Sequence, residues 1–153
     1  SYMIERTRFK MLMTLGIAIS SIFFLQALLS KGKINLEWEK FDNVSLQNYI
    51  NENKVILIDV TADWCVTCQV NKLTTLQNRN VEEFILKNKI KIIRADWTDK
   101  NSKILDFISK YGRFGIPVNL VYGPKNKDGI LLPEILSKDM LISKFNEAGL
   151  NEY

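Results

Sequence analysis

One long uncharged segment near the N-terminus differs in its hydrophobic pattern from the rest of the chain. Met11–Leu29 (MLMTLGIAISSIFFLQALL) contains 19 residues and no charge, close to the roughly 20 apolar residues that a helix needs to cross a bilayer. Because only scattered Thr, Ser and Gln side chains interrupt it, the segment lacks the polar face of a helix that packs on a soluble domain. The pattern therefore predicts a transmembrane helix.

The flanks of this segment favour a retained helix with a cytoplasmic N-terminus. Basic side chains lie on both sides, three before and two after: Arg6, Arg8, Lys10, Lys31 and Lys33. Positive charge concentrates on the cytoplasmic side of membrane helices, so we expect the rest of the chain outside the cytoplasm. A cleaved signal peptide would have a shorter apolar region and a small-x-small site, which 26–30 does not offer. Since the chain begins with Ser1 rather than Met, we expect a fragment or processed product in which this helix is the last of several.

After a polar connector over 31–44, the hydrophobic pattern predicts alternating helices and strands. Helices are expected over 45–50, 65–78, 81–86, 104–111 and 137–149, and strands over 55–61, 90–95, 118–122 and 130–136. Val55–Thr61 is nearly all apolar and rich in β-branched residues, which is typical of a central strand buried on both faces. Ser45 is the expected N-cap of the first of these helices, and Trp38 and Phe41 are expected to anchor the connector.

A hairpin is expected between the last two strands. Gly123–Pro124 and Lys127–Gly129 supply its turn residues, and Pro133 places the final strand at a sheet edge or a bulge. The order of helices and strands is that of a thioredoxin fold, an α/β fold with a central mixed sheet flanked by helices. We therefore expect a membrane segment over 1–30, the connector over 31–44 and a thioredoxin-like domain over 45–153.

The two cysteines of the chain, Cys65 and Cys68, lie where the apolar strand over 55–61 is expected to run into a helix. A C-x-x-C pair at such a junction is the thioredoxin-type redox motif, because the helix N-terminus stabilises a thiolate on the first cysteine. An inert disulfide or a metal site is the alternative. A structural zinc site needs about four Cys or His ligands, and the chain offers two cysteines and no histidine, so redox chemistry is favoured.

Composition narrows the remaining function classes. Without histidine, the chain cannot contain a Ser-His-Asp or Cys-His nucleophile system or a His-ligated metal hydrolase. The net charge of +4 comes from 21 Lys and Arg against 17 Asp and Glu spread along the chain, and no basic block suggests nucleic-acid binding. A length of 153 residues accommodates one domain with a core of its own.

Four stretches resemble the C-terminal thioredoxin-like domain of the DsbD family of thiol:disulfide interchange proteins. They are 59–71 (DVTADWCVTCQVN), 95–98 (ADWT), 112–117 (GRFGIP) and 132–134 (LPE). The resemblance covers roughly Trp38 to Leu150. It implies a domain that follows a multi-helix membrane core, faces the periplasm and relays electrons outward, with Met11–Leu29 similar to the last helix of that core.

The resemblance implies that Cys65 is the attacking thiolate and Cys68 the resolving thiol. Exposure at the start of a helix also favours Cys65 for attack, so we expect its side chain to be accessible. Asp59 matches the buried acid on the strand below the motif, where it would accept or relay the Cys68 proton with a pKa raised by desolvation. The alternative, an acid in contact with solvent at a strand edge, fits its apolar flanks less well.

Five further residues are expected near the site. Pro117 matches the thioredoxin-fold proline whose preceding bond is cis, and it would present the backbone of Ile116 to an extended partner strand. Trp64 is expected either to shape docking or to pack in the core. Asp63 is expected to tune the thiols or to cap the helix. Lys72 stands where some family members carry an acid, and a cation there would lower a nearby thiol pKa.

The leading hypothesis is a membrane-tethered thiol:disulfide oxidoreductase of the bacterial inner membrane, with its thioredoxin-like domain in the periplasm. Its redox group is the Cys65–Cys68 pair, and no organic cofactor or metal is implied. The expected partners are protein thiols and disulfides and an upstream membrane domain that donates electrons. Two alternatives stay open: a single-helix anchored thioredoxin for cytochrome c maturation, and a non-catalytic thioredoxin-like module for docking or metal carriage.

Overall fold

The computed structural model describes residues 13, 16–17, 19–24, 34 and 36–150. The chain divides into two compact units, Ser1–Lys33 and Ile34–Tyr153. In the first unit the described residues between 13 and 24 are helical. Most of the expected membrane span Met11–Leu29 lies outside the described residues, and within the described part no helix is long and apolar enough to cross a membrane.

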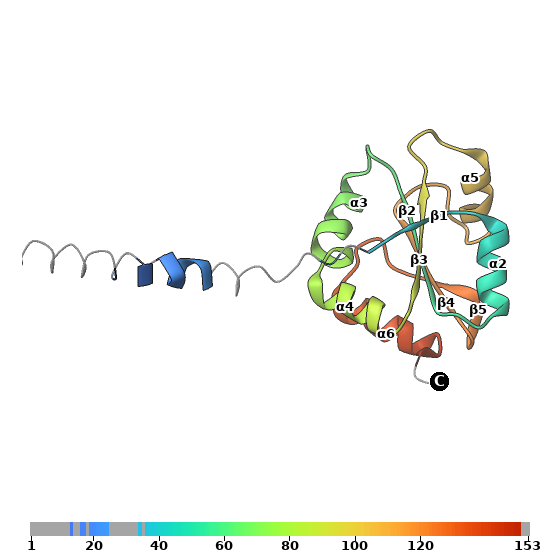
Figure 1. Ribbon diagram of the computed structural model, residues 1–153. Helices are drawn as coiled ribbons and strands as arrows, with labels where there is room; N and C mark the ends of the chain where they lie inside the picture. The colour runs from blue at the N-terminus through green and yellow to red at the C-terminus, as the bar shows by residue number, and fades with distance from the viewer. Residues whose placement is uncertain (1–12, 14–15, 18, 25–33, 35, 151–153) are drawn as a thin grey trace, which may run out of the picture. The chain divides into compact units, whose positions relative to one another are not determined.

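The second unit is built on a five-stranded mixed sheet (Figure 1) with the strand order β1-β3-β2-β4-β5. The strands are β1 Glu39–Lys40, β2 Ile56–Thr61, β3 Lys91–Asp96, β4 Val118–Gly123 and β5 Asn126–Leu131. β3 is parallel to both β1 and β2, whereas β4 is antiparallel to β2 and β5. The predicted α/β architecture is confirmed, and the strands expected over 55–61, 90–95 and 118–122 match within one residue at each end.

Helices cover both faces of this sheet (Figure 1). They are α2 Asn43–Asn51, α3 Val66–Asn71, which continues into the π-helical η1 Lys72–Leu76, α4 Arg79–Lys87, α5 Ser102–Ser109 and α6 Lys138–Glu147. Leu46 of α2 and Phe107 of α5 belong to one buried core, whereas Val81 of α4 and Phe145 of α6 belong to the other. The sheet therefore separates two hydrophobic cores.

The alternation of side chains along β2 determines what lies under α3. All residues from Ile56 to Val60 are buried. Ile56, Ile58 and Val60 join the core under α2 and α5, and Leu57 joins the opposite core. Because successive strand side chains point to opposite faces, Asp59 shares the face of Leu57 and lies on the side of the sheet that α3 covers.

The segment expected as a connector contains an edge strand that the hydrophobic pattern did not indicate. β1 has two polar residues, and it pairs with β3 through Glu39 opposite Ile93. The Glu39 carboxylate also accepts hydrogen bonds from Lys91 and Tyr49 at 3.0 and 2.8 Å. Such a strand is held by its neighbours rather than by apolar side chains of its own, so it leaves no periodic signal.

Two predictions were wrong: the N-cap of the first helix of the domain and the position of the hairpin turn. The N-cap of α2 is Asp42, whose Oδ2 accepts the backbone N–H of Ser45 at 2.8 Å, so Ser45 lies inside the helix. The hairpin turn lies at 124–125, so 127–129 belongs to β5 and Pro133 follows its end. The C-terminal end of α6 fixes this turn, because the Ala148 carbonyl accepts the N–H of Lys125 at 3.1 Å.

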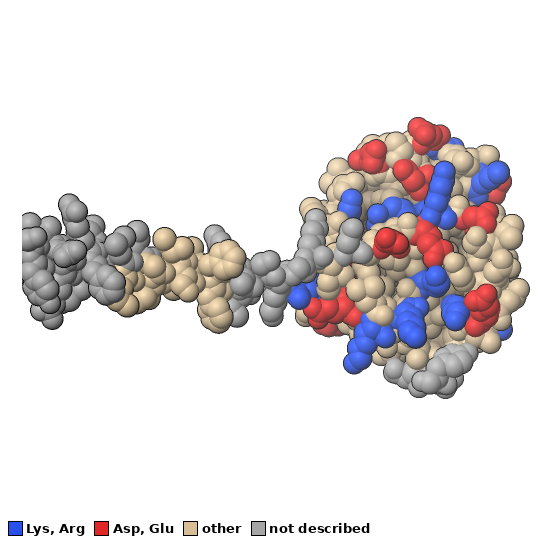
Figure 2. All heavy atoms as spheres, in the orientation of Figure 1, with Lys and Arg blue, Asp and Glu red and all other residues tan. Residues whose placement is uncertain are grey.

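The charged side chains of the second unit are mixed in sign. On the face that Figure 2 shows, Lys and Arg alternate with Asp and Glu over the surface. The exposed pairs include Arg79 with Glu83 at 2.7 Å and Lys144 with Glu147 at 2.6 Å. Exposed pairs of this kind contribute about 0–1 kcal/mol each, so the two cores and the sheet supply most of the stability.

Gly123→Ala is expected to destabilise the domain by about 1–3 kcal/mol, the usual cost of overpacking. A Cβ at Gly123 would overlap the backbone carbonyl of Ala148, which would push the end of β4 away from α6. Gly115→Ala is the matched control, because no atom lies within 4 Å of a Cβ there. Urea unfolding of both variants measures the difference, and equal midpoints for the two would contradict this packing.

Candidate active site

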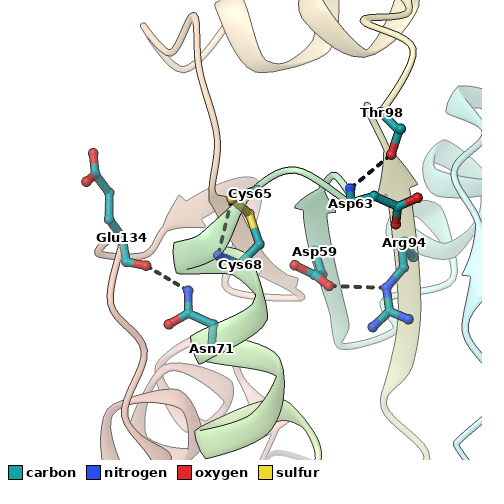
Figure 3. Close-up of a disulfide and its surroundings, with 8 residues drawn as sticks. All are labelled: Asp59, Asp63, Cys65, Cys68, Asn71, Arg94, Thr98 and Glu134. Atoms are coloured by element: carbon teal, nitrogen blue, oxygen red, sulfur yellow. Dashed lines mark hydrogen bonds and ion pairs between the residues drawn. A yellow bond between two sulfur atoms is a disulfide. The ribbon is translucent and has the colours of Figure 1, made fainter.

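Cys65 and Cys68 form a disulfide at the junction of β2 and α3 (Figure 3). Their Cα atoms lie 5.3 Å apart. Cys65 is the N-cap of α3, and its Sγ accepts the backbone N–H of Cys68 at 3.2 Å. The first N–H groups of a helix have no partner within the helix, so a sulfur at this position is stabilised in its thiolate form.

Both cysteines are buried, which corrects the expectation that the Cys65 side chain is accessible. Cys65 is 5% exposed and Cys68 is 3% exposed. Both pack with Ala62 and with Ile116, which comes from the loop before β4 and covers the disulfide. Accessibility therefore does not distinguish the two sulfurs, whereas the position of Cys65 at the helix end does.

Asp59 is a buried carboxyl on β2, on the α3 side of the sheet (Figure 3). Its Oδ2 accepts the Nε–H of Arg94 at 3.2 Å. Burial raises the pKa of Asp59 above its ordinary value, and the positive charges of Arg94 and Lys72 oppose this only in part. A raised pKa brings a carboxyl closer to the working pH than an ordinary aspartate, which is the direction that a general acid or base requires.

A cavity of about 170 Å³ lies next to this carboxyl. Its lining includes Asp59, Lys72 and Arg94, together with the exposed acids Asp63 and Asp96. The cavity thus has a buried carboxyl and exposed acids in one lining. Within the described residues, no group of three or more His, Cys, Asp or Glu side chains could hold a metal ion.

Thr98, which the sequence did not single out, holds the segment that precedes the cysteines. Its Oγ1 accepts the backbone N–H of Asp63 at 3.1 Å (Figure 3), and its carbonyl accepts the indole N–H of Trp64 at 3.1 Å. Trp64 is 51% exposed and packs against Trp97 with ring centroids 6.2 Å apart. Trp64 is therefore not a core residue. Asp63 was expected either to tune the thiols or to cap the helix. It does not cap α3, because Cys65 is the N-cap.

The loop before β4 brings apolar side chains to the disulfide. The Ile116–Pro117 peptide bond is cis, as the family resemblance implies, and Ile116 packs against both cysteines. Two exposed apolar residues that the sequence analysis did not select are close in sequence to these contacts. They are Val66, directly after Cys65 and 77% exposed, and Phe114, two residues before Ile116 and 74% exposed.

Asn71 ties α3 to the loop after β5 and was also missed. It is 1% exposed. Its Nδ2 donates to the carbonyl of Glu134 at 2.7 Å (Figure 3), and its Oδ1 accepts the N–H of Leu136 at 2.9 Å. Thr75 donates to the carbonyl of Leu136 at 3.0 Å. A polar residue on the inward face of a helix is the signal that could have identified Asn71.

The fold and the CxxC disulfide define a thioredoxin-like protein. Residues 37–124 match the thioredoxin-like family, and the chain belongs to this family. The chain is 27% identical over 119 residues to the thiol:disulfide interchange protein DsbD of Campylobacter jejuni (strain RM1221). This match covers 76% of this chain and 20% of that protein. The chain is 30% identical over 71 residues to DsbD 1 of Pseudomonas aeruginosa, which covers 46% of this chain and 12% of that protein.

Solved structures agree on the fold. The C-terminal domain of Neisseria meningitidis DsbD in its reduced form has a TM-score of 0.54 and 21% identity, covering 71% of this chain and 98% of that domain. A DsbH oxidoreductase has a TM-score of 0.55 and 22% identity, and the match covers 74% of this chain and 84% of that protein. The chain thus carries a thioredoxin-like domain that resembles the DsbD C-terminal domain, with a CxxC disulfide consistent with thiol:disulfide exchange. It spans about a fifth of the length of the DsbD proteins of Campylobacter jejuni.

Asp59→Asn is expected to raise the stability of the oxidised protein at pH 7. A carboxyl whose pKa is raised on folding favours the native state while it is protonated, and this contribution is lost as the pH rises through the folded pKa. An amide removes the buried charge at nearly constant shape, so the variant should gain most at neutral pH. The gain should fade toward about pH 4, where the aspartates of the unfolded chain also become protonated.

Urea midpoints of the parent and Asp59→Asn between pH 4 and pH 8 test this expectation. Asp99→Asn is the matched control, because Asp99 is exposed, and its effect should stay within about 0.5 kcal/mol at every pH. A loss of stability in Asp59→Asn that grows with pH would contradict the burial argument.

Proposed function

We propose that this chain is a thiol:disulfide oxidoreductase whose Cys65–Cys68 pair passes electrons to disulfides of periplasmic proteins. The observation that carries the proposal is the CxxC disulfide at the β2–α3 junction, where Cys65 Sγ accepts the Cys68 N–H and Asp59 lies on the strand below. The similarity to proteins named thiol:disulfide interchange protein DsbD supports the same reaction.

The reaction begins from the dithiol form. The Cys65 thiolate attacks one sulfur of a partner disulfide, forms a mixed disulfide and releases the first partner sulfur as a thiolate. Cys68 then gives its proton to the Asp59 carboxylate and attacks Cys65 Sγ. The Cys65–Cys68 disulfide forms, and the second partner sulfur leaves as a thiolate. Two electrons have passed to the partner, and a donor dithiol restores the starting form by the reverse exchange.

Trp64, Ile116 and Pro117 are proposed to dock the partner. Ile116 packs against the cluster formed by Ala62 and the two cysteines, so the loop that carries it lies beside the disulfide. Val66 and Phe114, close in sequence to the disulfide and to Ile116, are exposed apolar side chains that are proposed to take part in the same docking. A surface of this kind accepts many partner sequences, since apolar contact gives affinity without fixing hydrogen-bond partners.

Lys72 and Asp63 are proposed to tune the site. The Lys72 charge lowers the pKa of Asp59, so it favours the carboxylate that must accept the Cys68 proton. The same cation would favour a thiolate on a nearby cysteine. Asp63, which lines the same cavity, is proposed to oppose this effect through its negative charge.

Met11–Leu29 is proposed to anchor the chain in the inner membrane, with the domain from Trp38 onward in the periplasm and the residues between Leu29 and Trp38 linking the two. The uncharged length of the segment and its basic N-terminal flank support this arrangement. An upstream membrane domain is the proposed electron donor, because the DsbD proteins that the chain resembles are about five times as long as the matched region.

Cys68→Ala should accumulate a mixed disulfide through Cys65, whereas Cys65→Ala should trap about tenfold less. The reason is the thiolate fraction, which changes about tenfold per unit of thiol pKa, and Cys65 alone has the helix-end position that favours its thiolate. Non-reducing gels after incubation with a disulfide-bonded substrate such as insulin measure the adducts. Equal yields from the two variants would contradict the assigned roles, and a parent chain without insulin reduction would indicate a non-catalytic module.

The anchor has a separate test. Protease added to spheroplasts should digest the domain from Trp38 onward, and carbonate extraction should leave the parent chain in the membrane. Ile17→Lys with Phe23→Lys should release it, since a cation at the centre of a membrane helix costs about 2.5–3.5 kcal/mol. Full protection from protease, or extraction of the parent chain by carbonate, would contradict this topology.

A further inference from the structure

Three polar residues lie side by side across the sheet beneath the CxxC helix. In the strand register, Asp59 of β2 is opposite Arg94 of β3 on one side and Asn119 of β4 on the other. Directly opposite residues share a face of the sheet. This is the face of Leu57 and Val121, which α4 and α6 cover farther along the sheet and α3 covers near the disulfide. We name Arg94, Asp59 and Asn119 the polar row.

Asn119 differs from its neighbours on β4. Val118, Leu120 and Val121 are apolar and buried, and Asn119 is itself 1% exposed. Within the described residues, neither its Nδ2 nor its Oδ1 has a hydrogen-bond partner. A buried amide without partners costs free energy that an apolar side chain of similar size would not. Its presence opposite Asp59 therefore suggests a role in the chemistry of that carboxyl.

The bond from Arg94 leaves acceptor positions of the Asp59 carboxylate for a further donor. Arg94 donates to Oδ2 from the β3 side, and the charge of Lys72 acts from η1. Asp63 and Asp96 line the same cavity, and the cysteines lie on α3. A carboxylate offers about four acceptor positions on its two oxygens, so the Arg94 bond does not saturate it.

We propose that Asn119 is a positioning residue: in the dithiol form its side-chain amide donates a hydrogen bond to the Asp59 carboxylate, directly or through one water, and holds it ready to take the Cys68 proton. This inference rests on the proposed function. Burial makes the charged form of Asp59 unfavourable, so the resolving step needs donors that stabilise it. Arg94 supplies one from β3, and Asn119 supplies the second from β4.

The titration of Asp59 in the reduced full chain, in detergent micelles, tests this role directly. Carbon-13 NMR of the aspartate carboxyl groups would follow the parent, Asn119→Leu and Asn119→Ser, with the Asp59 signal assigned by its loss in Asp59→Ala. Asn119→Leu is expected to raise the midpoint of Asp59 by about one pH unit, because a hydrogen bond to the charged form is lost. Asn119→Ser keeps a donor and should shift the midpoint less.

A double-mutant cycle separates this role from a general change in packing. The pH midpoint of Cys65 alkylation by iodoacetamide should move in Asn119→Leu, and the same substitution should have no effect in an Asp59→Ala background. Leu120→Met is the matched control on β4. Leu120 belongs to the opposite core, so this variant should leave the Asp59 titration unchanged.

Two results would overturn the inference. One is an unchanged Asp59 midpoint in a folded Asn119→Leu protein, and the other is an equal shift in alkylation with and without Asp59. Failure of the proposed function would look different. A parent chain that does not reduce insulin would reject the oxidoreductase assignment, whereas the Asp59 titration would still report whether Asn119 stabilises the carboxylate.

Discussion

The burial of one carboxyl group is the constraint on which the site depends. Asp59 lies on a strand whose neighbours pack in two hydrophobic cores, and burying a charge there costs free energy unless it is paired or protonated. The single bond from Arg94 and the more distant charge of Lys72 compensate only in part, so the pKa of Asp59 stays raised. A strand position that Val or Ile would fill at less cost instead carries a titratable carboxyl on the side of the sheet that α3 covers.

Local signals in the sequence were enough for the central strands and the redox motif. The apolar run before the cysteines predicted β2, and the CxxC spacing predicted the helix that follows it. β1 was missed and the hairpin turn was misplaced, because both depend on partners elsewhere in the chain. Glu39 is held by Lys91 and Tyr49, and the turn at 124–125 is fixed by the Ala148 carbonyl. No periodicity within either segment carries that information.

The difference between local sequence signals and contacts from distant residues also applies within the site. Asp59 was selected and is buried, as predicted, because its apolar flanks are local. The burial of Cys65 could not be predicted in this way, since Ile116, which covers it, lies about fifty residues away in the sequence. Asn119 did leave a signal, because it interrupts a strand, β4, that is otherwise apolar. Arg94 did not, because β3 also carries Lys91 and Asp96. Polar residues on strands that are buried on both faces are expensive, and they therefore indicate chemistry more often than residues on exposed strands.

The energies of the surrounding contacts indicate which of them hold the backbone around the cysteines. The pair Arg113–Glu134 at 3.5 Å is about half exposed, and such pairs are worth about 0–1 kcal/mol. The bonds of Asn71 to Glu134 and Leu136 are different, because Asn71 is 1% exposed and unmaking a buried bond costs about 1–3 kcal/mol. Thr98 holds the other side, before the cysteines. The polypeptide is thus held on both sides of the CxxC, by Thr98 before the cysteines and by Asn71 after them.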